Sequence, residues 1–286
     1  MTDEITFEKK DYKPTFKTLD KWRKGKFKDD DRFKEYRNAF TGKQTEGWTF
    51  YRTYGEHTII INTSRIAFTK SDVKLIQNLQ LNYKKLFSVE NKFYMLDGRH
   101  IGEEVAKHYW NFFVSEKDDK TNYYHIRREA PTQLKSKTKE KEVIFSGRID
   151  ILDNANKLII ELKSHARKMN DFPHKSSMKQ AVIYKMGLIE EDAKKYEEYD
   201  LVVVGFMNKW QQENLQDAFW VIEISDEQYK EIEKEVNRQL KICMLWFEEA
   251  VIDKTTGKLE VECLKSADDK EQTELIKLWL RSRLEE

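Results

Sequence analysis

The chain has 286 residues, of which 39% are hydrophobic and 36% are charged, with a formal net charge of +1 at pH 7. This composition predicts a soluble globular protein with enough apolar residues for a packed core and a heavily ionised surface. A membrane span is excluded, since no run approaches the roughly 18 apolar residues that one requires, and the N-terminal stretch lacks the apolar segment of a signal peptide. We therefore expect a cytoplasmic protein without a membrane partner.

The two cysteines, Cys243 and Cys263, are typical of a reducing compartment. They are too few and too far apart for a zinc or iron–sulfur site made of cysteines alone. Charge is unevenly distributed, because Lys and Arg are in excess over residues 1–53 and acids are in excess over residues 226–286. The basic N-terminal region indicates a polyanion partner, although such an excess is usually just solvated surface.

The first predicted elements lie before residue 120. The aromatic and basic segment 1–53 is expected to be mostly helical, and the apolar alternation over 56–68 predicts a strand or hairpin. Thr69 or Ser71 would cap the amphipathic helix that follows at 72–87. A second helix is predicted over 102–113.

The remaining elements begin with β-forming sequence. A helix over 176–187 would end at Gly187, and Ser225 with Gln228 forms a capping box for a long helix over 226–250. Unbroken apolar character predicts buried strands at two of the five β-like runs, 200–207 and 218–224. The other three runs are 122–130, 142–152 and 157–163. From residue 102 to 208 the predicted order is therefore helix, three strands, helix, strand.

Two carboxylates and a lysine interrupt the β-forming stretch SGRIDILDNANKLIIELKS, residues 146–164. The DNAN segment has turn chemistry, and a four-residue loop would pair Asp153 with Leu158. That register sets Asp150 directly opposite Glu161, with Lys163 on the same face as Glu161. Like charges facing each other across a strand pair are destabilising, so a cation is expected between them.

Two interpretations of this face remain open. In one, the hairpin is an edge with a solvated face, and the three charged residues are ordinary surface residues. In the other, Lys163 and a divalent metal neutralise Asp150 and Glu161. The flanking runs carry apolar residues on both faces, as in a strand that is covered on both sides, and this favours the metal.

These residues resemble the PD-(D/E)XK nuclease signature, with Ile149 preceding Asp150 where the family commonly has proline. The ELK sequence at 161–163 follows, and Gln180 with Tyr184 resembles the Gln-x-x-x-Tyr pattern of the RecB-like branch, which includes Cas4 proteins and viral exonucleases. The resemblance covers roughly residues 95–208. It implies a restriction-endonuclease-like α/β core, whose helix, three strands, helix, strand order matches the predicted one.

The resemblance also implies a further metal ligand on the first core helix. Glu103 matches this position best, and Glu104 and His100 are the alternatives. One or two Mg²⁺ or Mn²⁺ ions would be held by Glu103, Asp150, Glu161 and the Leu162 main-chain carbonyl. Such ions lower the pKa of bound water and neutralise a phosphate. Lys163 would orient or help deprotonate the water.

Several residues are expected to contact nucleic acid. The resemblance implies backbone contacts or a bracing role for Gln180 and Tyr184, and basic residues near the strands could meet phosphates. The expected nucleic-acid-binding residues are Arg148, His165, Arg167, Gln180 and Tyr184.

The chain also departs from the family. Cas4 proteins commonly hold an iron–sulfur cluster with four cysteines, and this chain has no cysteine before Cys243, so no cluster is expected. A nucleotide-binding GKS or GKT motif is absent too. Any unwinding would have to come from a helicase or recombination partner.

The sequence thus predicts one α/β restriction-endonuclease-like domain. It comprises an N-terminal, mostly helical extension over 1–95, a nuclease core over 96–225 and a C-terminal helical extension over 226–286. The expected function is a Mg²⁺- or Mn²⁺-dependent DNA exonuclease of the RecB- or Cas4-like type, acting on single- or double-stranded DNA. The alternatives are an RNA endonuclease of the cap-snatching type and an inactive nucleic-acid-binding protein on the same fold.

Overall fold

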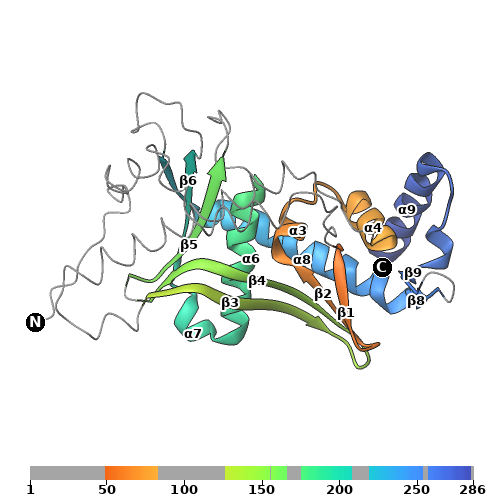
Figure 1. Cartoon of the computed structure of the whole chain (residues 1–286), viewed down its shortest axis with the longest axis horizontal. Helices are drawn as coiled ribbons and strands as arrows, with labels where there is room; N and C mark the ends of the chain where they lie inside the picture. Colours follow the sequence, from red (N-terminus) through yellow and green to blue (C-terminus); the bar gives the residue numbers. More distant parts are fainter. Residues whose placement is uncertain are drawn as a thin grey trace, which may run out of the picture.

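The computed structural model describes residues 49–82, 126–154, 156–165, 175–207, 219–253 and 257–284. Over these residues the protein is a mixed α/β structure with a seven-stranded mixed sheet and several helices (Figure 1). The described helices include none that is long and apolar enough to cross a membrane.

The sheet and its helices alternate along the chain. The strands of the main sheet are β1 (Tyr51–Tyr54), β2 (Thr58–Asn62), β3 (Ile126–Lys137), β4 (Glu142–Asp153), β5 (Leu158–His165), β6 (Asp200–Met207) and β7 (Phe219–Glu223). A separate two-stranded sheet consists of β8 (Val251–Ile252) and β9 (Leu259–Glu260). The helices are α3 (Thr63–Ala67), α4 (Asp72–Leu81), α6 (Lys175–Glu191), α7 (Ala193–Tyr196), α8 (Asp226–Glu249), α9 (Asp269–Leu284) and the 3-10 helix η3 (Glu262–Leu264).

The sheet forks at β4. Strand β3 pairs antiparallel with β4 along its length. The opposite edge of β4 is shared, because β2 pairs parallel with residues 142–146 and β5 pairs antiparallel with residues 151–153. Among the described strands, residues 147–150 therefore have a partner on one edge only. Beyond the fork, β5 runs parallel to β6, and β6 pairs antiparallel with β7.

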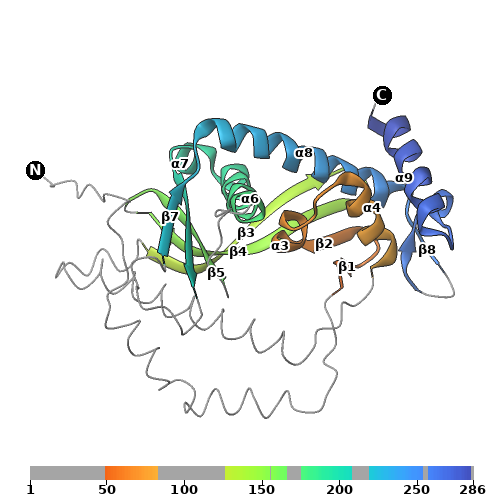
Figure 2. The same ribbon diagram turned by 90° about the horizontal axis from the view of Figure 1, so that it is seen from above.

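Helices α6 and α8 cover one face of the sheet beside the fork (Figure 2). Val143, Phe145 and Ile149 of β4 are fully buried, and so is Ile159 of β5. Burial of such side chains supplies the main favourable free energy of folding. The capping box predicted for α8 is confirmed, since Ser225 and Gln228 bond each other's backbone N–H groups.

Residues 49–82 differ from the expected helical extension. They contain β1 and β2, and β2 joins the main sheet through Ile59 and Ile61, which are fully buried. Strand β2 ends at Asn62. The Asn62 side chain accepts the Ser64 N–H at 2.9 Å and is the N-cap of α3. The strand or hairpin predicted over 56–68 is confirmed by β2, which pairs antiparallel with β1 and parallel with β4. The mostly helical character expected before it was wrong for residues 51–53, which belong to β1.

Helix α4 begins at Asp72 with Ser71 as its N-cap, as predicted. It ends at Leu81, followed by Asn82 in the left-handed region with φ of 32°. The rest of the predicted helix 72–87 lies outside the described residues, and so does the predicted helix 102–113.

Gly187 does not end α6, which continues to Glu191, so the predicted stop was wrong. A Cβ atom at this position would lie 2.6 Å from Thr132 Oγ1 and 2.8 Å from the Gln133 carbonyl oxygen. The glycine is therefore needed where α6 passes close to β3, and not for a left-handed helix end.

We expect Gly187→Ala to destabilise the protein by about 2 kcal/mol, even though alanine has the higher helix propensity. The obstructing Gln133 carbonyl belongs to the backbone of β3 and cannot move aside without disturbing its pairing with β4. Urea denaturation of the variant and the wild type measures the difference. Equal or greater stability of the variant would contradict the close approach.

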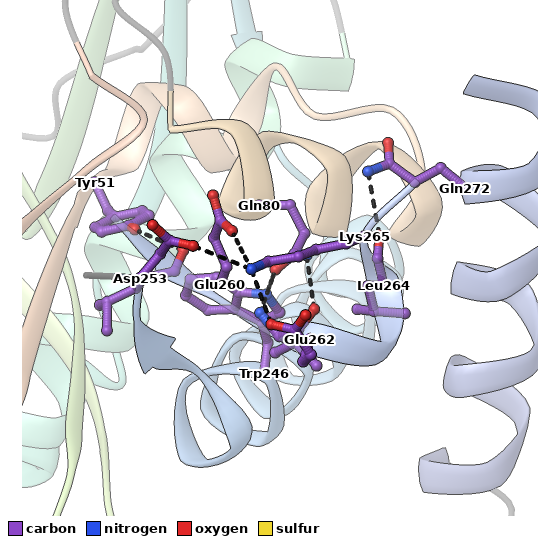
Figure 3. Close-up of polar contacts among 11 residues, drawn as sticks. Tyr51, Gln80, Trp246, Asp253, Glu260, Glu262, Leu264, Lys265 and Gln272 are labelled. Carbon is purple, nitrogen blue, oxygen red and sulfur yellow. Dashed lines mark hydrogen bonds and ion pairs between the residues drawn. The ribbon is translucent and has the colours of Figure 1, made fainter. Parts of the chain in front are cut away.

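A buried glutamine joins the C-terminal segment to the rest of the protein (Figure 3). The Gln80 side-chain oxygen accepts the Val261 N–H and the Trp246 indole N–H, both at 2.8 Å. Its amide nitrogen donates to the Val261 carbonyl at 3.0 Å. One side chain of α4 thus satisfies the backbone beside β9 and a buried indole of α8.

Lys265 lies among three carboxylates of the C-terminal segment that follows α8 (Figure 3). Its ammonium is 3.2 Å from Asp253, 3.0 Å from Glu260 and 2.8 Å from Glu262. Hydrogen bonds to these carboxylates raise the pKa of Lys265. Because the group is exposed, each pair adds little to stability.

Candidate functional site

The hairpin of β4 and β5 has the register that its turn predicts. Asp153 pairs with Leu158, and the ladder runs only to Ile151 with Ile160. At the next level Asp150 Oδ2 accepts the Leu162 N–H at 2.7 Å. The Asp150 carboxylate therefore takes the place of a backbone partner where the two strands separate. The predicted pairing of Asp150 with Glu161 is one residue beyond the last pair of the ladder.

Glu161 is deeply buried, with 2% of its side chain exposed. Its Oε1 forms an ion pair with Lys163 Nζ, whose side chain is 20% exposed. Its Oε2 is buried and has no hydrogen-bond partner within the described residues. An ionised carboxylate with an unpaired buried oxygen is costly, so this oxygen requires a proton or a cation.

The pKa values of the two carboxyl groups are governed by burial and by their closeness to each other and to Lys163. Burial and the Glu161 carboxylate raise the pKa of Asp150 well above its usual range, against the effect of Lys163 and the Leu162 N–H. Burial also raises the pKa of Glu161, which Lys163 and the neighbouring Asp150 carboxyl group partly offset. Both carboxyl groups thus bind protons more tightly than free ones, which is expected of a site that lacks positive charge.

Helix α6 holds Lys163 through two residues one turn apart. Lys163 Nζ donates to Gln180 Oε1 at 2.9 Å, and Gln180 Nε2 donates to the Tyr184 hydroxyl at 2.6 Å. A lysine only donates hydrogen bonds, so the amide orientation of Gln180 is determined by its neighbours. Burial and the Glu161 charge raise the pKa of Tyr184, and the hydroxyl therefore stays protonated.

The Tyr184 side chain packs closely against β4 at Gly147, within residues 147–150. A Cβ atom on Gly147 would lie 2.5 Å from the Tyr184 ring atom Cε1 and 2.7 Å from Thr63 Oγ1. The sequence analysis did not predict that Gly147 lies in close contact with Tyr184 and Thr63. A glycine inside a strand is a recognised signal of close approach, whereas nothing local in the sequence indicates Thr63.

Arg148 lies beside the site on β4, and its Nη1 is 3.9 Å from Glu129 Oε2. Both side chains are exposed, and Glu129 was not predicted as a site residue. The Leu162 N–H is fixed by Asp150, while the role of the Leu162 carbonyl as a metal ligand stays a prediction. His165 belongs to β5, but its side chain lies outside the described residues. So do Glu103, Glu104, His100 and Arg167.

The described residues contain no group of three or more His, Cys, Asp or Glu side chains that could hold a metal ion. They do contain the orphaned Glu161 Oε2 next to Asp150, and carboxylate oxygens are the ligands that Mg²⁺ and Mn²⁺ prefer. The two carboxylates therefore fit a metal of this kind. Other residues or water molecules would have to supply the remaining ligands.

We expect Tyr184→Phe to reduce the activity of this site about tenfold while lowering stability by only about 1 kcal/mol. The change removes the hydroxyl that holds Gln180 Nε2, so Lys163 loses part of its support and the ring still fills its space. Activity and thermal unfolding of the same preparation measure both effects. Full activity of the variant would show that Lys163 is positioned without this chain of hydrogen bonds.

The comparisons with known proteins leave the family open. No protein-family model matches the chain, and the search of curated proteins finds no match. One similar solved structure is the crystal structure of SSO0001. It is 14% identical, covers 75% of this chain and 86% of its own, and has a TM-score of 0.37, a likeness too low to carry an argument. The class established by fold and site is a mixed α/β protein with a buried carboxylate pair at a fork in its sheet.

Proposed function

We propose that this protein is a metal-dependent nuclease that hydrolyses phosphodiester bonds, of the PD-(D/E)XK type, and that its substrate is DNA. The observation that carries the proposal is the buried, unpaired Glu161 Oε2 beside Asp150, with Lys163 adjoining. In a protein that only binds nucleic acid, buried carboxylates would weaken binding, because anionic carboxylates repel anionic phosphates.

The order of elements supports a restriction-endonuclease-like core. Strands β3, β4 and β5 are followed by α6, the short α7 and then β6, as in the predicted order after its first helix. The fork between β2 and β5 places Asp150 and Glu161 where two strands separate. Asp150 keeps partial exposure there, whereas Glu161 is deeply buried.

The residues have distinct roles in this proposal. Asp150 and Glu161 would hold Mg²⁺ or Mn²⁺, with Glu103 as the expected third carboxylate. When bound, such an ion lowers the pKa of a water molecule and offsets the charge of the phosphate. Lys163 offsets the buried carboxylates and orients the attacking water. Gln180 and Tyr184 keep the Lys163 ammonium directed at the site.

A cleavage assay tests the proposal. Linear end-labelled and closed circular DNA, each single- and double-stranded, are incubated with the wild type in Mg²⁺, Mn²⁺ or EDTA, and an RNA of the same sequence is included. We expect loss of label from linear DNA only with a metal. Degradation of linear but not circular DNA identifies an exonuclease, in keeping with the RecB-like resemblance.

Two further results would contradict the proposal in different ways. Cleavage restricted to RNA would replace the DNA nuclease with an RNA endonuclease of the cap-snatching type. No cleavage of any substrate with either metal would leave a protein that binds nucleic acid without catalysis. The variant Asp269→Asn, at an exposed position of α9, is the matched control for Asp→Asn changes at the site.

A further inference from the structure

Glu129 is a third carboxylate at the level of Asp150 in the sheet. In the antiparallel ladder of β3 and β4, Arg128 pairs with Ile151 and Ala130 pairs with Ile149. Glu129 falls between these pairs, opposite Asp150. Extending the β4–β5 register by one residue beyond Ile151 and Ile160 sets Glu161 opposite Asp150, so three neighbouring strands each place a carboxylate at one level of the sheet.

The side chain of Glu129 lies on the site's face of the sheet. Its carboxylate is 3.9 Å from Arg148, which shares a face of β4 with Asp150 because side chains alternate along a strand. Glu129 is therefore on the same face and at the same level as Asp150, although the described residues form no direct metal-binding cluster there.

The backbone of Glu129 has an unfavourable conformation. Its φ is 51°, in the left-handed region that glycine adopts readily and that other residues rarely adopt. A glycine would be the less strained residue here, and the glutamate supplies no buried packing, since its side chain is about half exposed. The chain thus places a carboxylate where the fold alone favours a residue without a side chain.

The charges at this level do not balance. Glu129, Asp150 and Glu161 carry three negative charges when ionised, whereas the ion pairs described here provide Arg148 and Lys163. Like charges on adjacent strands destabilise the sheet. Independently of this count, the buried Glu161 Oε2 has no hydrogen-bond partner among the described residues and requires a proton or a cation.

We infer that Glu129 is a positioning residue of the metal site, acting through the water shell of a divalent ion held by Asp150 and Glu161. The inference rests on the proposed function. Mg²⁺ and Mn²⁺ retain several waters when few protein ligands are present, and a carboxylate just outside the ligands accepts hydrogen bonds from them. Glu129 is suited to this role because it is exposed, charged and level with Asp150.

Calorimetric titration of the full chain with MnCl₂, without nucleic acid, tests the inference. We expect Glu129→Gln and Glu129→Gly each to weaken Mn²⁺ binding about tenfold, as loss of such outer carboxylates typically does. Glu142→Gln, at the opposite end of β4, is the matched control and should bind as the wild type does. Thermal unfolding should show Glu129→Gly to be at least as stable as Glu129→Gln, because glycine relieves the strained φ.

A purely structural role for Glu129 gives a different pattern. If Glu129 served only to hold Arg148, then Arg148→Met would reproduce the effects of Glu129→Gln, whereas the inference predicts unchanged or tighter Mn²⁺ binding when this competing cation is removed. Binding by both Glu129 variants within twofold of the wild type would overturn the inference while leaving the metal site intact. Absence of Mn²⁺ binding by the wild type would overturn the proposed function itself.

Discussion

Asp150→Asn is expected to reduce metal-dependent cleavage at least 100-fold and, at the same time, to stabilise the metal-free protein. The amide oxygen of asparagine can still accept the Leu162 N–H, so the hairpin is retained. The negative charge that a metal requires is lost. Cleavage of end-labelled DNA and thermal unfolding in EDTA measure the two effects. Asp269→Asn should leave cleavage unchanged and should lower stability by less than about 1 kcal/mol, because its acid is lost from the first turn of α9.

The sign of the stability effect follows from the raised pKa of Asp150. A carboxyl group whose pKa is higher in the folded state stabilises the fold below its unfolded pKa, and this contribution is lost as the pH rises through the folded pKa. At pH 8, where this carboxyl group is ionised in the unfolded chain, its raised pKa lowers the stability of the fold. Asn removes this cost, about 1–2 kcal/mol or a few degrees in Tm. The advantage of the variant should shrink towards pH 5. A variant less stable than the wild type at pH 8 would show that Asp150 is structural.

Lys163→Met is expected to destabilise the protein by about 3 kcal/mol at pH 8. The change leaves the Glu161 carboxylate buried without the ammonium that pairs with it. It also removes the group proposed to orient the attacking water, so cleavage should be lost as well. Urea denaturation measures the stability. The loss should be smaller at low pH, where Glu161 can take up a proton.

Two companion variants show whether this cost comes from the buried charge. Lys277→Met removes an exposed lysine paired with Glu274 on α9 and should cost less than about 1 kcal/mol. The double variant Lys163→Met with Glu161→Gln should recover most of the lost stability without recovering cleavage. If the double variant is as unstable as Lys163→Met alone, the cost arises from packing and not from an unpaired carboxylate.

Local chemistry explains which parts of the fold could be predicted. The four-residue turn determines the pairing of Asp153 with Leu158, and the capping box determines where α8 begins. Strand β6 was predicted with its observed bounds because a strand covered on both faces is apolar throughout. In each of these cases the determining residues are neighbours in the sequence.

Long-range pairing explains what could not be predicted. Strand β2 is stabilised by β4, and no local pattern shows that residues 58–62 and 142–146 are parallel neighbours. The same limit applies within the site. Glu129 is level with Asp150 only through the register of β3, and its positive φ has no signature in a non-glycine residue. Glu103, Glu104 and His100 stay predictions, since they lie outside the described residues.

The fork in the sheet also has a kinetic consequence. At the fork, β2 (residues 58–62) pairs with one end of β4, and β5 pairs with β6 (residues 200–207). The site therefore depends on contacts between distant parts of the chain. Such contacts form slowly during folding. Because the Leu162 amide is bonded to the Asp150 side chain, its hydrogen exchange rate reports how often β5 separates from β4 at the site in the native protein.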